Sequence, residues 1–231
     1  MKVFLDKKPK NVKIIAGFPG VGLVGTITTE FLIEHLNAEQ IGKIKIEETP
    51  PIVAVHQGKV VEPIGIFYNK KHNLIILHAL TSINNIEWQL ADEICYIMKE
   101  LKAKEVISIE GIGSTNTENP NVYFLSNLSS VSKKLDLENL KEGIVMGVTG
   151  ALLLKSCLIL TCLFAETHSN LPDSRAAANI IKTLDKYLGL KIDYKPLLEK
   201  AVKFENKIKE LMNQRELASS AKEKKELTYL G

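Results

Sequence analysis

The chain has 231 residues and a formal net charge of +3, from 30 lysine and arginine and 27 aspartate and glutamate residues. This length suits one large domain, or one domain with an appendage, and it is enough to bury a core without disulfide bonds. The weak net charge, with acidic and basic residues mixed along the chain, excludes the concentrated basic surface typical of a nucleic-acid-binding protein.

The cysteines and the amino-terminal sequence indicate a cytoplasmic protein. Cys95, Cys157 and Cys162 form no C-x-x-C pair and lie in apolar stretches, as small core residues of a reducing compartment do. No charged segment followed by an apolar one opens the sequence, so we expect no signal peptide.

One apolar segment, residues 144–165, is long enough to cross a bilayer. Its single charge, Lys155, lies near the middle, where insertion is costly, and Gly147 and Gly150 interrupt the first half. Two buried strands, or a strand and a short helix, at 144–148 and 158–165 fit the segment better. We therefore expect no membrane span.

A glycine-rich corner joins an apolar run at residues 12–16, a predicted strand, to a predicted helix at 23–37. It reads Gly17-Phe18-Pro19-Gly20-Val21-Gly22-Leu23-Val24-Gly25 and contains the G-x-G-x-x-G spelling of a dinucleotide fingerprint. In that interpretation Gly20 and Gly22 lie near a phosphate at the start of the helix. In the alternative interpretation the glycines only permit a tight turn and close packing of the helix on the sheet.

The elements after the corner favour the structural interpretation. A nucleotide-binding unit needs a second strand, for which residues 41–46 would serve, followed directly by a crossover helix. Here Pro50-Pro51 follows, and then strand-like runs at 52–55, 60–68 and 74–80 that are separated by turns. This order predicts an antiparallel meander in place of the helix.

The remaining pattern alternates strands and helices. We predict strands at 1–5, 106–109 and 123–125 and helices at 84–102 and 128–135. A further helix is predicted from its N-cap Asp173 to about Leu188, where Gly189 stops it.

Few residues suggest catalysis, since the sequence has no nucleophile elbow, P-loop or zinc-protease motif. The first candidate cluster is Glu166 with His168 and Asp173, in a loop after a buried strand, where α/β proteins often bind ligands. Glu110, beside Gly111 and Gly113 at the end of its strand, is the second candidate. We favour a capped helix start with a solvent-facing histidine as the explanation of the first cluster, because no nucleophile is evident. We predict no cofactor and no metal site.

From Pro196 onward, the apolar residues recur every three or four positions, and the residues between them are mostly lysine and glutamate. This narrow stripe predicts a seam for one neighbouring helix, in the same chain or in another subunit, and we expect a homo-oligomer. The stripe consists of Leu197, Ala201, Phe204, Ile208 and Leu211.

The last five residues, Leu227-Thr228-Tyr229-Leu230-Gly231, follow a charged spacer at 222–226. An apolar end on a polar spacer either folds back on its own domain or docks into a pocket of a partner.

Besides the corner at 17–25, the sequence contains further short motifs: Pro63, Glu110-Gly111, Gly147-x-x-Gly150-x-Leu152-Leu153, Glu166-Thr167, and Pro172-Asp173 with Ala176-Ala177. In this order and spacing they resemble the proteasome assembly chaperone 2 family, and most of all its archaeal branch. The resemblance extends to about Met212.

The resemblance implies a three-layer α/β core similar to nucleoside phosphorylases, with a mixed, partly antiparallel sheet and without phosphorylase activity. It also implies an oligomeric chaperone that binds proteasome α-subunits or the α-ring. Proteasome activators of this kind insert a C-terminal hydrophobic–Tyr–any tripeptide between α-subunits. Here Tyr229 is third from the end and follows Thr228, so the tail departs from that pattern.

We therefore expect an α/β chaperone core at 1–194, an amphipathic helical segment at 195–226 and an apolar tail at 227–231. The expected function is proteasome assembly without catalysis, with partner contacts made by Leu227, Tyr229, Leu230 and Gly231. Two alternatives stay open. One is a nucleoside- or nucleotide-handling enzyme, with Gly20 and Gly22 near a phosphate, and with Glu166 or Asp173 on a sugar. The other is an adaptor or activator that caps mature proteasomes through its tail.

Overall fold

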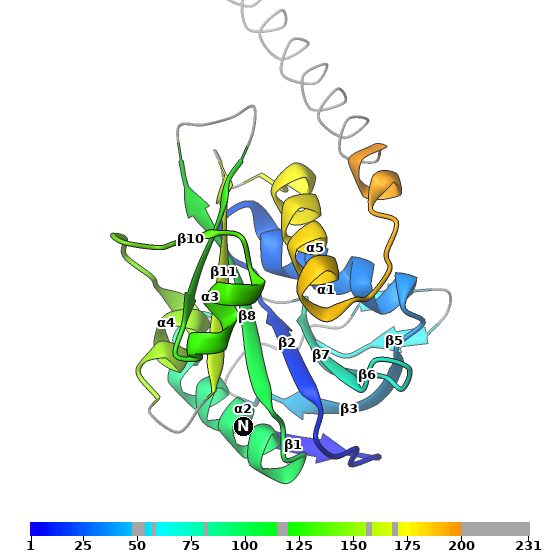
Figure 1. The fold of residues 1–231 in the computed structure, drawn as a ribbon. Coiled ribbons are helices and arrows are strands. Elements are labelled where there is room, and N and C mark those ends of the chain that lie inside the picture. Colours follow the sequence, from blue (N-terminus) through cyan, green and yellow to red (C-terminus); the bar gives the residue numbers. More distant parts are fainter. Residues whose placement is uncertain are drawn as a thin grey trace, which may run out of the picture.

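The computed structural model describes residues 1–47, 54–56, 59–80, 83–114, 120–155, 159–167 and 171–199, with the backbone alone at 54–56 and 59–61. Within these residues a nine-stranded mixed sheet carries helices on both faces (Figure 1). The expected α/β fold with a partly antiparallel sheet is therefore confirmed.

The centre of the sheet is parallel. Its strands, in the order β7 (Leu74–Ala79), β2 (Lys13–Gly17), β8 (Glu105–Gly113) and β11 (Leu160–Thr167), all run in the same direction. Their sequences are nearly continuous apolar runs because helices cover both faces, and β7 is buried at every position.

Antiparallel strands extend the sheet on both sides. Beyond β7 lie β6 (Ile64–Asn69), β3 (Glu39–Lys45) and the edge strand β1 (Lys2–Leu5), so the predicted edge strand and the antiparallel pairing before β7 are confirmed. The single strand predicted at 60–68 is interrupted at residues 62–63, and only its second part joins this sheet. Beyond β11 lie β9 (Val122–Ser126) and the short β10 (Glu138–Asn139). Strands β4 (Ala54–His56) and β5 (Lys59–Val61) form a separate hairpin.

The helices form the two outer layers. On one face lie α1 (Val24–His35), α3 (Ser129–Lys134) and α5 (Ser174–Leu188), and on the other lie α2 (Glu87–Glu100) and α4 (Gly147–Leu153). A short 3-10 turn, η1 (Val21–Leu23), precedes α1. The helix predicted at 84–102 is confirmed as α2. An apolar stripe along α2 and its two flanking residues faces the core, because all its members are buried: Ile86, Leu90, Ile94, Ile97, Met98 and Leu101.

Of the two alternatives for the apolar segment at 144–165, a strand with a short helix is confirmed by β11 and α4, whereas the alternative of two buried strands is wrong. Residues 143–146 form a loop in which Ile144 and Met146 are exposed, and Gly147 begins α4. Gly150 lets this loop lie close to the helix, because a Cβ there would lie 2.8 Å from the carbonyl oxygen of Val145. The apolar run therefore divides between a loop, a helix and β11. Within the described part of the chain, none of the helices combines the length and hydropathy that a bilayer crossing requires.

Both predicted ends of α5 are confirmed. Asp173 caps the start, since its Oδ1 accepts hydrogen bonds from the backbone N–H groups of Arg175 (3.1 Å) and Ala176 (2.9 Å). Gly189 ends the helix in the left-handed conformation with φ of 66°. Cys95 and Cys162 are buried, as predicted, and burial raises the pKa of the Cys162 thiol to about 12.

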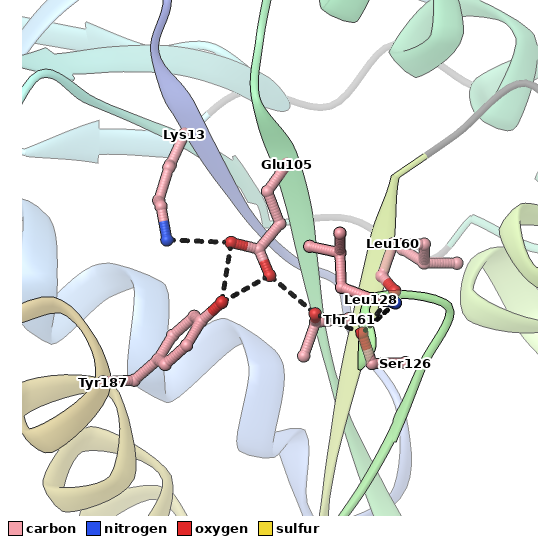
Figure 2. A network of polar contacts seen from close by, with 7 residues as sticks. All are labelled: Lys13, Glu105, Ser126, Leu128, Leu160, Thr161 and Tyr187. Carbon is pink, nitrogen blue, oxygen red and sulfur yellow. Dashed lines mark hydrogen bonds and ion pairs between the residues drawn. The ribbon is translucent and has the colours of Figure 1, made fainter. Parts of the chain in front are cut away.

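A buried ionic network fixes α5 to the amino ends of the parallel strands (Figure 2). Glu105 is only 2% exposed, and its carboxylate lies 2.9 Å from Lys13 Nζ on the neighbouring strand. The Tyr187 hydroxyl of α5 donates to both carboxylate oxygens, at 2.9 and 3.0 Å. Thr161 of β11 donates a further hydrogen bond of 2.6 Å. The buried charge is thus paired and hydrogen-bonded, as a stable buried carboxylate must be.

Candidate functional site

The carboxyl ends of the parallel strands meet at one edge of the sheet, which is where open α/β sheets bind ligands. A pocket of about 430 Å³ lies at this edge. The corner after β2, the start of α2, the end of β8 and the loop before α4 line it. Its charged lining residues among those described are Glu87, Glu110 and Glu142, and we call it the acidic pocket.

Glu110 is the most perturbed side chain of the acidic pocket. Thr149 of α4 donates a hydrogen bond of 3.1 Å to its carboxylate, and the Ser108 hydroxyl lies 2.9 Å from that of Thr149. Burial raises the pKa of Glu110 to about 7, although the Thr149 bond acts in the opposite direction. This carboxyl group can therefore hold or release a proton near neutral pH, a property frequent at functional sites.

Each glycine of the dinucleotide-like fingerprint has a packing reason. A side chain at Gly20 would overlap Oε1 of Glu110. Gly22 has φ of 65°, and a Cβ there would lie 2.5 Å from the Thr167 hydroxyl. A Cβ at Gly25 would lie 2.9 Å from the carbonyl oxygen of Ile109. These contacts favour the interpretation in which the glycines only permit a turn and close packing. The carboxylate of Glu110 lies where a dinucleotide-binding corner would hold a phosphate.

Asp173 and Gly22 are neighbours, but outside the residues that line the acidic pocket. Asp173 is 7% exposed, and its backbone N–H donates to the carbonyl oxygen of Gly22 at 2.8 Å. Its Oδ2 accepts a hydrogen bond of 2.9 Å from Thr167, while Oδ1 caps α5. This carboxylate ties the corner, β11 and α5 together.

Glu166 faces strand β9 instead. It accepts hydrogen bonds from the backbone and side-chain nitrogens of Asn121, at 3.0 and 3.1 Å, and from the Tyr123 hydroxyl at 3.3 Å. The alternative ligand site predicted from the sequence is therefore dispersed in the structure. Gly20 lies with Glu110, Gly22 lies with Asp173, and Glu166 is apart from both pairs. His168 lies outside the described residues.

Most of the predicted carboxyl-terminal sites also lie outside the described residues. The exception is Leu197, which is 6% exposed and packs in the apolar cluster beneath α1 and α5. The other seam residues (Ala201, Phe204, Ile208, Leu211) and the tail residues (Leu227, Tyr229, Leu230, Gly231) are not among those that the structure describes.

Sequence reasoning missed Glu87, Glu142 and Thr149 as members of the site. Thr149 stands inside the Gly147-x-x-Gly150 motif, whose glycines marked a change of backbone direction. In the structure this motif starts α4, and that position brings Thr149 to Glu110 of β8. No sequence pattern links Glu87 or Glu142 to Glu110, because the three residues are far apart in the chain and lie on different elements.

The fold and the pocket define a class: a three-layer α/β protein with a buried carboxyl group beside a glycine-rich corner, at the carboxyl edge of its parallel strands. A family model described as PAC2 family matches residues 14–212. The chain belongs to the PAC2 family, as the sequence motifs predicted.

Individual proteins match over nearly the whole chain. The protein MJ0106 of Methanocaldococcus jannaschii is 30% identical over 224 residues, which are 94% of this chain and 92% of that protein. The crystal structure of PbaA from Pyrococcus furiosus, an archaeal homolog of proteasome-assembly chaperone, has a TM-score of 0.81 and 31% identity, covering 96% of this chain and 97% of PbaA. PbaB of the same organism, an archaeal proteasome activator, has a TM-score of 0.77 at 21% identity, covering 91% of this chain and 98% of PbaB, and therefore shows the fold alone.

Proposed function

We propose that this chain is a cytoplasmic proteasome assembly chaperone that binds proteasome α-subunits and catalyses no reaction. The observation that carries the proposal is the end-to-end similarity to PbaA, at 31% identity over 96% of this chain. The corner glycines support a function without a nucleotide, because packing accounts for each of them.

The tail is the first contact surface that we assign to the α-subunit. Leu227, Tyr229 and Leu230 combine aliphatic and aromatic side chains after a charged spacer. A short apolar segment on a polar spacer can enter a pocket, and tyrosine supplies a large contact area with few rotatable bonds. The free carboxylate of Gly231 then has a lysine of that pocket as its natural partner.

A binding experiment with two versions of the chain tests this function. Purified α-subunit from the same organism is passed over the immobilised intact chain and over a version that ends at Glu226. We expect the intact chain to retain the α-subunit and the shortened chain to retain much less. Absence of retention by the intact chain would contradict the proposed function.

We also propose that the chain forms a homo-oligomer through the later residues of the stripe (Ala201, Phe204, Ile208 and Leu211), since Leu197 itself packs within its own chain. Apolar residues at a seam left in water would form an exposed patch, which oligomerisation would cover. Phe204→Glu or Ile208→Glu should lower the oligomer order or the solubility. A wild-type chain that sediments as a monomer at micromolar concentration would rule the oligomer out.

An enzyme is the second candidate, and one observation favours it: the pKa of Glu110 is raised to about 7 inside a pocket. A ligand that binds only the folded chain must raise its stability. Thermal unfolding with nucleosides, phosphate, ATP or NAD tests this candidate. The chaperone proposal predicts no saturable rise in melting temperature, and a rise at micromolar ligand would favour the enzyme.

An activator that caps mature proteasomes is a third candidate, distinguished by binding to assembled particles rather than to free α-subunits.

A further inference from the structure

Large apolar side chains are concentrated on the outside of α2, of α4 and of the loop between β10 and α4. Among the described residues, the three most exposed large hydrophobic side chains are Ile144 (88%), Met146 (74%) and Leu154 (72%). Trp88 of α2 is 53% exposed. Single exposed apolar residues are normal on a protein surface, but a contiguous group marks an interaction site.

Three of these side chains line one groove. Trp88, Met146 and Leu154 border a hollow of about 240 Å³ whose other lining residues include Gly147, Gly150 and Ala151. These small residues of α4 leave space between its surface and the start of α2. We call this feature the apolar groove.

The aromatic side of the groove is held in place. Lys155 Nζ lies 5.6 Å from the centroid of the Trp88 ring and pairs with Asp92, one turn further along α2. This arrangement neutralises the lysine and covers one side of the ring. An anchored tryptophan loses little conformational freedom on binding, which is typical of residues that dominate interface energies.

The acidic pocket adjoins the apolar groove. Glu87, Val145, Met146 and Gly147 line both hollows. The charged side chains among the described lining residues of the two hollows are Glu87, Glu110 and Glu142, and all are acidic. The combined surface therefore complements a ligand that is apolar at one end and basic at the other.

We propose that the apolar groove and the acidic pocket together bind a segment of the α-subunit that carries an apolar side chain next to a lysine or arginine. The apolar side chain enters the groove against Trp88, and the basic side chain enters the pocket toward Glu87 and Glu142. This inference rests on the proposed function for the identity of the partner, and it adds a second contact surface on the globular core, separate from the tail.

The single tryptophan of the chain makes the surface observable. Biosynthetic incorporation of 5-fluorotryptophan gives one fluorine NMR signal, from Trp88, whether or not the partner contains tryptophan. We expect this signal to shift when unlabelled α-subunit is added. The chain that ends at Glu226 should show the same shift at higher α-subunit concentrations, because the groove lies on the core.

Substitutions on the surface test the apolar contact. Met146→Gln and Leu154→Gln change exposed side chains, so the fold should be kept, which a melting curve verifies. Each should weaken α-subunit binding about tenfold or more, the effect typical of central interface residues. Leu171→Gln, an equally apolar exposed position before α5, is the matched control and should bind as the wild type does.

A double substitution tests the charged contact. Glu87→Gln with Glu142→Gln should weaken binding at low salt and flatten its salt dependence, because attraction between exposed charges is screened by ions. The control is Glu30→Gln with Glu34→Gln, two exposed positions on α1 at the opposite face of the sheet, which should change neither property.

The outcomes separate this inference from the proposed function. If the α-subunit binds but the groove variants bind as tightly as the wild type and the Trp88 signal does not move, the inference is wrong and the proposed function stands. If the α-subunit binds no version of the chain, both are wrong. If the Trp88 signal shifts when the chain alone is concentrated, the groove is an interface between copies of this chain, and the inference is overturned.

Discussion

The backbone of Gly20 packs directly against the carboxylate of Glu110, so a side chain at position 20 would have to displace that carboxylate. The middle of the glycine-rich corner thus accommodates an acidic group from the next strand of the sheet. A phosphate at this position would face a carboxyl group that is partly ionised at neutral pH. This relationship favours packing, rather than nucleotide binding, as the reason for the glycine at position 20.

The close packing of α1 on the sheet predicts that Gly25 is sensitive to substitution. A Cβ there would lie 2.9 Å from backbone atoms of both Ile109 and Phe18, which have no freedom to move aside. Gly25→Ala should lower the free energy of unfolding by about 1–3 kcal/mol, as overpacked contacts do. Urea denaturation measures the change. Gly113→Ala is the control, since no atom of the described part of the chain lies within 4 Å of its added Cβ. Equal effects at the two positions would contradict the packing explanation.

The raised pKa of Glu110 predicts a pH-dependent stability. The pKa is about 7 in the folded chain against an ordinary value of 4.5, so between these pH values the folded state binds more protons than the unfolded state. Stability therefore falls as the pH rises through this window, by about 3 kcal/mol from this group.

Glu110→Gln should remove that loss. Relative to the wild type, the variant should gain stability between pH 5 and pH 8, as measured by urea denaturation at several pH values. Glu30→Gln, at an exposed position of α1, serves as the control. A difference between wild type and Glu110→Gln that does not vary with pH would show that Glu110 titrates normally.

The buried ion pair at the opposite end of the sheet predicts an unequal response to two lysine substitutions. Lys13→Met leaves Glu105 buried without a cation and should cost about 2 kcal/mol of folding free energy, because a buried charge then lacks its partner. Lys8→Met removes an exposed pair with Glu100 and should have little effect. Similar costs for the two substitutions, measured by denaturation, would mean that the Tyr187 and Thr161 hydroxyls alone stabilise Glu105.

Thr28 offers a stabilising substitution. Its side chain is fully buried in α1, and its hydroxyl has no hydrogen-bond partner among the residues that the structure describes. Thr28→Val keeps the shape and removes the unsatisfied polar atom, so the free energy of unfolding should rise by about 1 kcal/mol. A thermal or urea unfolding curve measures it. Thr29→Val is the opposite control, because the Thr29 hydroxyl contacts His78 Nδ1 at 2.9 Å and its loss should destabilise the chain.

The tail prediction concerns binding rather than stability. Tyr229→Ala should weaken α-subunit binding by about 2 kcal/mol or more, which is typical of an aromatic anchor, with the melting temperature and oligomer unchanged. Thr228→Ala is the control at the adjacent position, and isothermal titration calorimetry gives both affinities. Adding residues after Gly231 should also weaken binding if its carboxylate takes part. A chain shortened at Glu226 that binds as tightly as the intact chain would contradict the prediction.

The amino-acid sequence by itself determined the elements and the family. The apolar runs of β2, β7, β8 and β11, the 3.6-residue stripe of α2, and the Asp173 and Gly189 caps of α5 are local patterns, and the structure follows them. The sequence left a strand or a short helix open at residues 144–148, because a continuous apolar run has the same appearance in a buried strand and in a loop that leads into a helix. Only packing decides between the two, and here Ile144 and Met146 face outward.

The tertiary structure alone decided which side chains form a site. Whether Gly20 meets a phosphate or Glu110, and whether Asp173 faces a ligand or Thr167, depends on the register of β8 and β11 beside the corner. The groove beside Trp88 likewise arises from α2 and α4, which are far apart in the chain and become neighbours only on the sheet. Local sequence patterns fix the periodicity of each element, whereas a site depends on side chains from several elements, whose distances are set by the packing of the whole chain.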